Sequence, residues 1–174
     1  MKRVAAATVL IALSQALAAF VGPSDALSNA DNEMLRRTAE ELRGAILRGD
    51  AQGVLKFVSR TGLGCTDTQI PYSRVKKDLR DTNSHLYLSL FDSLRFSKRC
   101  GAQYPPEFPA TSDRDFFLAT RDGAIEIHSL SDGMAQVVFK SDRKDLYQRE
   151  YDFRKETGVW KLVYGLIVGS CSCG

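Results

Sequence analysis

The chain has 174 residues, of which 44% are hydrophobic and 26% charged, and its formal net charge at pH 7 is +3. This length is enough for one domain with a hydrophobic core and too short for two domains of ordinary size. Basic and acidic residues are interspersed, and even the densest run, RVKKDLRD at 74–81, contains two acids. This pattern is typical of a solvated helix face and argues against a nucleic-acid partner, which would require a one-sided basic patch.

The first 26 residues have the parts of a secretory signal peptide: a basic start, an uncharged apolar stretch at 4–21, and a helix break at Gly22 and Pro23. Small residues before the cut favour cleavage after Ala26, and Ala18 marks an earlier alternative. An uncleaved anchor is the competing interpretation, since about 18 apolar residues can span a bilayer. Because the many alanines make the stretch weakly hydrophobic, we expect cleavage.

Residues 27–174 are therefore expected to form one domain, in the periplasm or outside the cell, with no stable membrane anchor after signal removal. Loss of Lys2, Arg3 and Asp25 lowers the formal net charge from +3 to +2. No cysteine directly follows the apolar stretch, so a lipid-anchored lipoprotein is not indicated.

The mature chain begins with a helical pattern at 28–48, where apolar residues recur at steps of four, three and four. These residues are Leu35, Ala39, Leu42 and Ile46. Asn29 or Asp31 is expected to cap the start of this helix. Asp50 would then cap a second, shorter helix over 51–59.

The middle of the chain alternates connections and short helices. Residues 61–72, rich in Gly, Thr and Pro, are predicted to form an irregular connection. Ser73 would cap a third helix over 74–81, and Ser84 a fourth over 85–94. In the fourth segment the leucines alternate as in a strand and also fit helical spacing, and we favour the helix.

Residues 100–112 contain three prolines together with Tyr104 and Phe108. We expect a long ordered loop whose aromatic side chains are candidates for a contact surface, although a plain connection is the simpler interpretation. Ser112 or Asp113 can cap a single helical turn after this loop.

From residue 124 onward, apolar side chains alternate with polar ones, which is the period of β-strands. Short polar or glycine-containing turns separate the alternating segments, as in antiparallel hairpins. The four segments are 124–130, 134–140, 146–155 and 159–169. Helices followed by such strands define the segregated α+β class, so we expect N-terminal helices packed on a curved four-strand antiparallel C-terminal meander.

This order of elements resembles the nuclear transport factor 2-like cone fold of the SnoaL and ketosteroid isomerase type. The resemblance rests on Gly49 and Asp50, where the first helix turns into the second, and on the G-x-W-K-L strand with Gly158, Trp160 and Leu162. It implies a fold whose members include isomerases, small-molecule-binding proteins and interaction modules. The isomerase members use a carboxylate and a tyrosine inside the cone, and the sequence assigns neither. Exported inhibitors and immunity proteins are a competing analogy.

Cys65, Cys100, Cys171 and Cys173 form an even set in a chain with an export signal, which favours disulfides. A bridge between Cys171 and Cys173 would be short and strained, so we favour a link from the tail to Cys65 or Cys100 that secures the last strand. The alternative is metal binding or redox exchange by the C-terminal C-S-C. Because zinc sites prefer wider spacing, no metal ligand and no cofactor is predicted.

Glu126 and His128 are the candidate catalytic pair, since their spacing places both on one face of a strand, as a general acid and base could require. Their face alternates with Ile125 and Ile127, so a solvent-facing strand surface is the simpler interpretation. His85, at the start of an apolar segment, is expected to be a cap or surface residue.

Aromatic residues of the last two strands are further candidates for a ligand or partner surface. They are Tyr151, Trp160 and Tyr164, which join Tyr104 and Phe108 of the proline-containing loop. Aromatic residues at strand spacing are more often part of the core.

Together these features favour a small exported binding module that contacts an unidentified protein or apolar ligand without turnover. One alternative is a cone-fold enzyme with isomerase- or hydrolase-like acid/base chemistry, and another is a thiol redox or metal protein that uses the C-S-C tail. An enzyme needs a cavity that holds a carboxylate or histidine in apolar surroundings, whereas a binding module needs an exposed patch.

Overall fold

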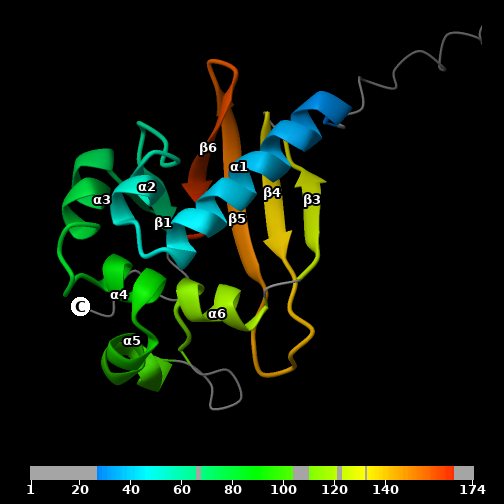
Figure 1. Ribbon diagram of the computed structural model, residues 1–174. Helices are drawn as coiled ribbons and strands as arrows, with labels where there is room; N and C mark the ends of the chain where they lie inside the picture. The colour runs from blue at the N-terminus through cyan, green and yellow to red at the C-terminus, as the bar shows by residue number, and fades with distance from the viewer. Residues whose placement is uncertain (1–26, 66–67, 104–109, 121–122, 132, 167–174) are drawn as a thin grey trace, which may run out of the picture.

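The computed structural model describes residues 27–65, 68–103, 110–120, 123–131 and 133–166 (Figure 1). The predicted signal peptide and the two C-terminal cysteines lie outside these residues. Helices lie mainly in the N-terminal half and a four-stranded antiparallel sheet lies in the C-terminal half, which confirms the α+β class.

Six α-helices and a 3-10 turn are present in the described part of the chain. They are α1 (Asn29–Leu47), α2 (Ala51–Leu55), α3 (Tyr72–Asp78), α4 (His85–Phe91), α5 (Ser93–Cys100), η1 (Gly101–Gln103) and α6 (Asp113–Ala119). Two short strands form a hairpin, and four longer ones form the main sheet. They are β1 (Leu63–Cys65) and β2 (Thr68–Ile70), then β3 (Ile125–Ser129), β4 (Met134–Phe139), β5 (Arg149–Glu156) and β6 (Val159–Tyr164).

The first two helices begin at side chains that accept hydrogen bonds from the first turn. Ser28 Oγ accepts from the Asp31 amide at 3.1 Å, so Ser28 is the N-cap of α1. The cap predicted at Asn29 or Asp31 is therefore wrong, because the serine just before them already binds the first turn. Asp50 Oδ1 accepts from a backbone amide of α2 at 2.7 Å and caps that helix, as predicted.

The fourth predicted helix is confirmed, and Asp92 divides it into α4 and α5. Ser84 caps α4 through its side chain, as predicted. The third helix covers Tyr72–Asp78 rather than 74–81, and its N-cap is Pro71 instead of Ser73, with no side-chain cap hydrogen bond. Proline sets its own φ near the helical value and has no amide hydrogen to satisfy, which suits this boundary.

Residues 61–72 contain the β1–β2 hairpin and are not the irregular connection that was predicted. Leu63 pairs with Ile70 across it. Each strand has only three residues, too few for an alternating pattern to be recognised. Gly62 precedes the hairpin with φ +102°, and a Cβ at this position would collide with the Ile70 carbonyl, so the turn requires a residue without a side chain.

The main sheet has the order β3-β4-β5-β6, as the predicted meander requires. A β-bulge between Asp152 and Phe153 pairs Tyr164 with the first and Leu162 with the second. Because Asp152 and Phe153 point to opposite faces, Tyr164 lies on the face opposite to Leu162. Strict alternation along 159–169 would put Trp160, Leu162 and Tyr164 on one face, and the bulge moves Tyr164 to the other face.

Residues that follow α2 extend the sheet beyond β6. Val58 forms a parallel bridge with Leu162. The Ser59 amide donates to the Leu162 carbonyl at 2.9 Å, and the Leu162 amide donates to the Phe57 carbonyl at 2.8 Å. This pairing explains why α2 ends at Leu55, earlier than predicted.

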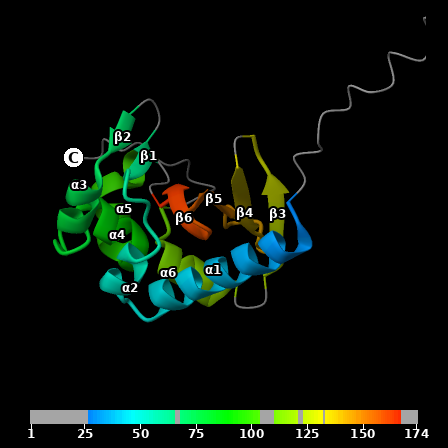
Figure 2. The ribbon, with the colours of Figure 1, turned by 90° about the horizontal axis from the view of Figure 1, so that it is seen from above.

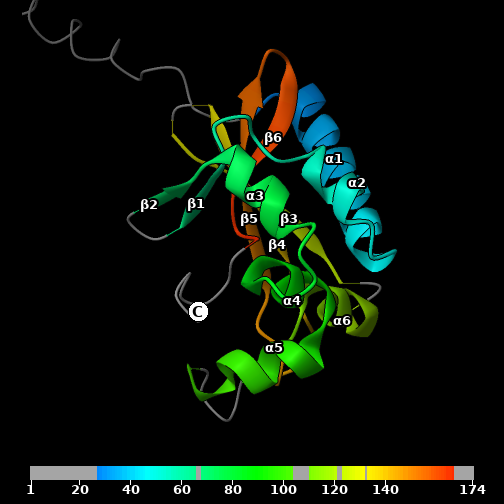
Figure 3. The ribbon, with the colours of Figure 1, turned by 90° about the vertical axis from the view of Figure 1, so that its left-hand side faces the viewer.

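Helix α1 crosses one face of the sheet, which we call the inner face (Figures 1 and 2). The apolar stripe predicted for α1 is buried there: Leu35, Ala39, Leu42 and Ile46 are each at most 1% exposed. A second, smaller cluster lies where α5 packs beside α4, and it comprises Leu88, Phe96, Cys100 and Ala110. Figure 3 shows α3, α4 and α5 following one another along one side of the molecule.

Candidate functional site

A buried polar network lies between α6 and β5. Asp113, the first residue of α6, is 4% exposed, and its Oδ1 accepts a hydrogen bond from Arg149 Nε at 2.8 Å. Its Oδ2 accepts from the Tyr151 hydroxyl at 2.9 Å. Arg149 also donates to the carbonyls of Thr111, at 2.8 Å, and Tyr147, at 3.1 Å. The carboxylate and the guanidinium therefore compensate each other inside the core.

Burial dominates the electrostatics of this network. It raises the pKa of Asp113, and the charge of Arg149 opposes this effect. It also raises the pKa of Tyr151 well above its usual value, and the neighbouring Asp113 carboxylate adds to the rise. Tyr151 is therefore a neutral hydrogen-bond donor at physiological pH, and both oxygens of Asp113 are already bound.

Aromatic rings fill the space between the network and the sheet. The ring centroids of Phe117 and Phe139 are 4.9 Å apart, and those of Phe139 and Tyr151 are 5.7 Å apart. Tyr151 and Trp160 are 0% and 1% exposed. Both lie on the inner face of the sheet, which α1 and α6 cover, so they are part of the core, the simpler of the two interpretations of these aromatic residues.

The candidate catalytic pair lies on the outer face of β3. His128 Nε2 is 3.5 Å from Glu126 Oε2, and Lys140 Nζ is 3.1 Å from the same oxygen. The spacing thus brings the two side chains together, as predicted. Both are exposed, with about half of each side chain accessible, so the pair lacks the enclosed apolar setting of a catalytic acid and base.

A row of polar side chains continues across the outer face, since His128, Gln136, Asp152 and Tyr164 are paired in register. Gln136 Nε2 donates to Asp152 Oδ1 at 3.1 Å. Burial raises the pKa of Asp152, and the charge of Glu150 adds to the rise. Tyr164 is exposed at the end of this row and remains a candidate contact residue.

His85 is neither the cap of α4, which is Ser84, nor a fully exposed residue. Its Nδ1 lies 3.4 Å from Cys100 Sγ, and its ring meets the Phe96 ring edge to face. Burial lowers the pKa of His85, and the charge of Arg99 lowers it further. The folded protein therefore favours the neutral imidazole.

Neither of the two described cysteines, Cys65 and Cys100, is a free thiol. Cys171 and Cys173 lie outside the described residues, so their pairing stays a prediction. Tyr104 and Phe108 lie outside the described residues as well. Within the described ranges, no group of three or more His, Cys, Asp and Glu side chains is placed to hold a metal ion.

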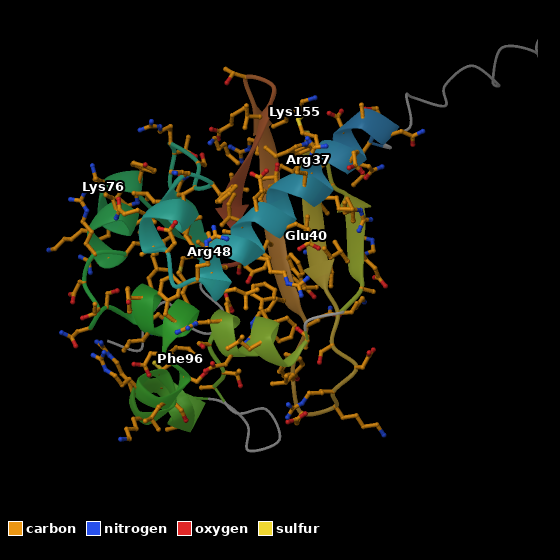
Figure 4. All side chains as sticks on the ribbon, in the orientation of Figure 1. Arg37, Glu40, Arg48, Lys76, Phe96 and Lys155 are labelled. Carbon is orange, nitrogen blue, oxygen red and sulfur yellow. The ribbon has the colours of Figure 1, made fainter. Side chains whose placement is uncertain are left out.

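A groove of about 460 Å³ runs between the C-terminal half of α1 and α2. Its floor is formed by Gly44, Ala45, Gly53 and Phe57, where the two glycines leave room between the helices. Its walls carry six charged side chains, which are Arg37, Glu40, Glu41, Arg48, Asp50 and Lys56. Figure 4 shows Arg37, Glu40 and Arg48 along the exposed side of α1.

We call this groove the α1–α2 groove. Some of its charged side chains have partners in the protein and others do not. Glu40 is 3.4 Å from Arg43, and Asp50 accepts from the Gly53 amide. In the part of the chain that the structure describes, the side chains of Arg48 and Lys56 form no ion pair. Glu41, whose side chain likewise forms no ion pair within the described residues, adds one carboxylate, so the groove offers an apolar floor, two cations and one anion to an incoming group.

The buried network includes residues that the sequence pattern did not single out. Arg149 alternates in step with Tyr151 and Phe153, so its place on the inner face could have been read from strand spacing. A charged residue on an inner face needs a buried acid as partner. Asp113 was assigned only a capping role, because a partner 36 positions away leaves no local signal.

Comparison of the sequence with protein-family models and with curated proteins finds no match. In the described residues, no helix has the length and hydrophobicity to cross a bilayer.

Proposed function

We propose that this protein is an exported binding module that holds a segment of a partner protein in the α1–α2 groove and turns over no substrate. The main support for this proposal is that side chains fill the interior of the protein around its buried carboxylate. Asp113 is a carboxylate in apolar surroundings, as a cone-fold enzyme would need, but Arg149 and Tyr151 bind both its oxygens. Catalysis would require such a group to face a cavity.

The contact surface must lie outside this core. The inner face of the sheet is covered by α1 and α6, and Phe116 and Phe117 of α6 are buried against it. The α1–α2 groove is open to solvent and has an apolar floor, so it can receive a side chain of a partner.

The chemistry of the groove selects the kind of segment that fits. Ala45 and Phe57 suit an aliphatic or aromatic side chain. Arg48 and Lys56 favour carboxylates beside that side chain, since an arginine binds a carboxylate through two parallel hydrogen bonds. We therefore expect a partner segment with one apolar residue flanked by acidic residues.

The same proposal includes export, disulfide bonds and the cone fold. The signal-peptide pattern supports periplasmic or extracellular localisation. The state of Cys65 and Cys100, neither of which is a free thiol, supports disulfides to the tail. Two leading helices followed by a C-terminal antiparallel meander support the resemblance to the nuclear transport factor 2-like fold.

A selection of binding peptides tests the groove. The exported protein is used to select a phage-displayed library of random peptides, and the dissociation constants of the enriched peptides are measured by fluorescence anisotropy. We expect enriched sequences with an apolar residue beside acidic ones. The double variant Arg48→Glu with Lys56→Glu should weaken their binding by tenfold or more, which is about 1.4 kcal/mol.

The matched control reverses two exposed cations of the sheet region, Lys144 and Arg154, to glutamate, and changes the net charge by the same amount. It should bind the selected peptides like the wild type. Peptides that bind wild type and the groove variant equally would show that the groove is not the contact site. Enrichment of no peptide would overturn the proposal.

A further inference from the structure

We propose that the face formed by α3 and α5 binds reversibly to the surface of an anionic phospholipid bilayer. This basic face comprises four cationic side chains and one exposed leucine, which are Lys76, Lys77, Arg80, Leu94 and Lys98. It does not include the α1–α2 groove, so it is independent of the function proposed above.

The acids of this region are already engaged within their own turns. Asp78 accepts from Arg74 Nε at 2.9 Å on both oxygens. Asp81 accepts from the Asn83 amide at 2.9 Å. Asp92 accepts from the first turn of α5, as its N-cap. The charge of Asp78 is therefore balanced by Arg74 and that of Asp92 by Arg95, whose guanidinium lies 3.7 Å away, whereas Asp81 leaves one negative charge near the four cations of the face.

The cations of the basic face, in contrast, point into solvent. In the residues that the structure describes, no ion pair or hydrogen bond is formed by the side chains of Lys76, Lys77, Arg80 and Lys98. Figure 4 shows Lys76 extending away from the body of the protein. Residues 74–81 thus present a solvated helix face, as predicted, but their two aspartates do not balance the charge of their two lysines and two arginines.

Hydrogen bonds tie α5 to the segment that follows α3. Arg95 and Arg99 of α5 both donate to Asn83, in the connection between α3 and α4, and the Arg99 bond to the Asn83 carbonyl is 2.7 Å long. These bonds fix α5 relative to this connection, and α4 contacts both helices. Figure 3 shows the two helices along the same side of the molecule.

Leu94 distinguishes a bilayer from an acidic protein as the partner. It is 68% exposed, more than the other exposed large apolar residues of the described chain. Tight protein interfaces are anchored by aromatic residues, yet the exposed tyrosines of the described chain, Tyr147 and Tyr164, lie in the sheet half and not on α3 or α5. An aliphatic side chain among lysines suits insertion at the headgroup level, where long lysine stems keep their charge in water.

Binding of the exported full-length gene product to vesicles tests this face. Sedimentation is compared for vesicles of phosphatidylcholine alone and vesicles that also contain phosphatidylglycerol. We expect binding to the anionic vesicles only, and loss of that binding in high salt. The double variant Lys76→Gln with Lys98→Gln should bind about 25-fold more weakly, since each basic residue near an anionic surface contributes about fivefold.

Two further variants test whether binding depends on this face and not on the net charge of the protein or on a loss of folding. Lys144→Gln with Arg154→Gln removes two exposed cations outside α3 and α5, one in β5 and one in the connection before it, and should leave binding within about twofold. Leu94→Gln, a surface change that leaves the charge intact, should weaken binding several-fold. Equal losses in the two double variants, or equal binding to both kinds of vesicle, would overturn the proposal. Binding to soluble polyglutamate but not to vesicles would overturn it in favour of an acidic protein.

Discussion

Residues of β5 bind both carboxylate oxygens of Asp113, so its charge contributes to the free energy of unfolding of the protein. Asp113→Asn leaves the buried Arg149 without a counter-charge, which should lower the free energy of unfolding by about 3–5 kcal/mol. Urea unfolding followed by the fluorescence of Trp160, the single and buried tryptophan of the chain, measures this loss.

The control for this change is Asp145→Asn, which removes an exposed ion pair with Arg143. Its urea midpoint should match that of the wild type, because exposed ion pairs contribute little. A midpoint shift of similar size in both variants would contradict the structural role given to Asp113.

His85 makes the stability depend on pH. Burial and Arg99 lower its pKa in the folded state, so the unfolded state binds a proton more readily. The contribution of His85 is therefore complete above the unfolded pKa of about 6.5 and is lost as the pH falls below it. His85→Gln should reduce the fall in the free energy of unfolding between neutral and mildly acidic pH, measured by urea titrations at several pH values.

The second histidine of the chain provides the control for this measurement. His128 lies on the exposed outer face of β3. His128→Gln makes the same change at an exposed position, so it should alter the slope less than His85→Gln does. A slope that is lost in His128→Gln and kept in His85→Gln would show that the assignment to His85 is wrong.

Among the secondary-structure elements, the β1–β2 hairpin depends on one backbone position. Gly62→Ala places a methyl group against the Ile70 carbonyl at positive φ, and should lower the free energy of unfolding by about 2 kcal/mol or more. Gly133 also has positive φ, but a Cβ there would meet open space, so Gly133→Ala should cost about 1 kcal/mol. Thermal unfolding of the two variants measures the difference, and equal losses would contradict the close contact at Gly62.

Periodicity predicted those elements that are long enough to show several turns or pleats. The stripe of α1 and the alternation of β3 to β6 are of this kind, and both are confirmed. The β1–β2 hairpin has three residues in each strand, and the bulge beside Asp152 depends on pairing with β6. Both are set by contacts between distant segments, which a local pattern does not contain.

At the scale of the whole molecule, the candidate sites likewise combine features that sequence spacing predicts with features that appear only when the chain folds. The spacing of Glu126 and His128 correctly placed them together on the outer face of the sheet. The groove and the basic face each combine two helices, so their charges come together only when the chain folds. Asp113 and Arg149 likewise needed the fold to become neighbours.

The state of the four cysteines is a property of the whole mature chain. Intact mass after export, with and without thiol alkylation under non-reducing conditions, should show loss of residues 1–26 and no alkylated thiol, since Cys65 and Cys100 are not free. Reduction before alkylation should label all four cysteines, which is the positive control. Alkylation of two or more thiols without reduction would contradict the disulfide prediction.

The parallel bridge between Val58 and Leu162 has a consequence for the order of folding. It joins the end of the second helix to the last strand, and Asp31 pairs with Lys155 across 124 positions. Helix α1 also packs on α2, α6 and β3, all of which precede β5 in the chain, but the end of α2 and Asp31 find these two partners only on β6 and β5. Because contacts between segments far apart in the sequence form slowly, we expect the edge of the sheet at β6 to close last.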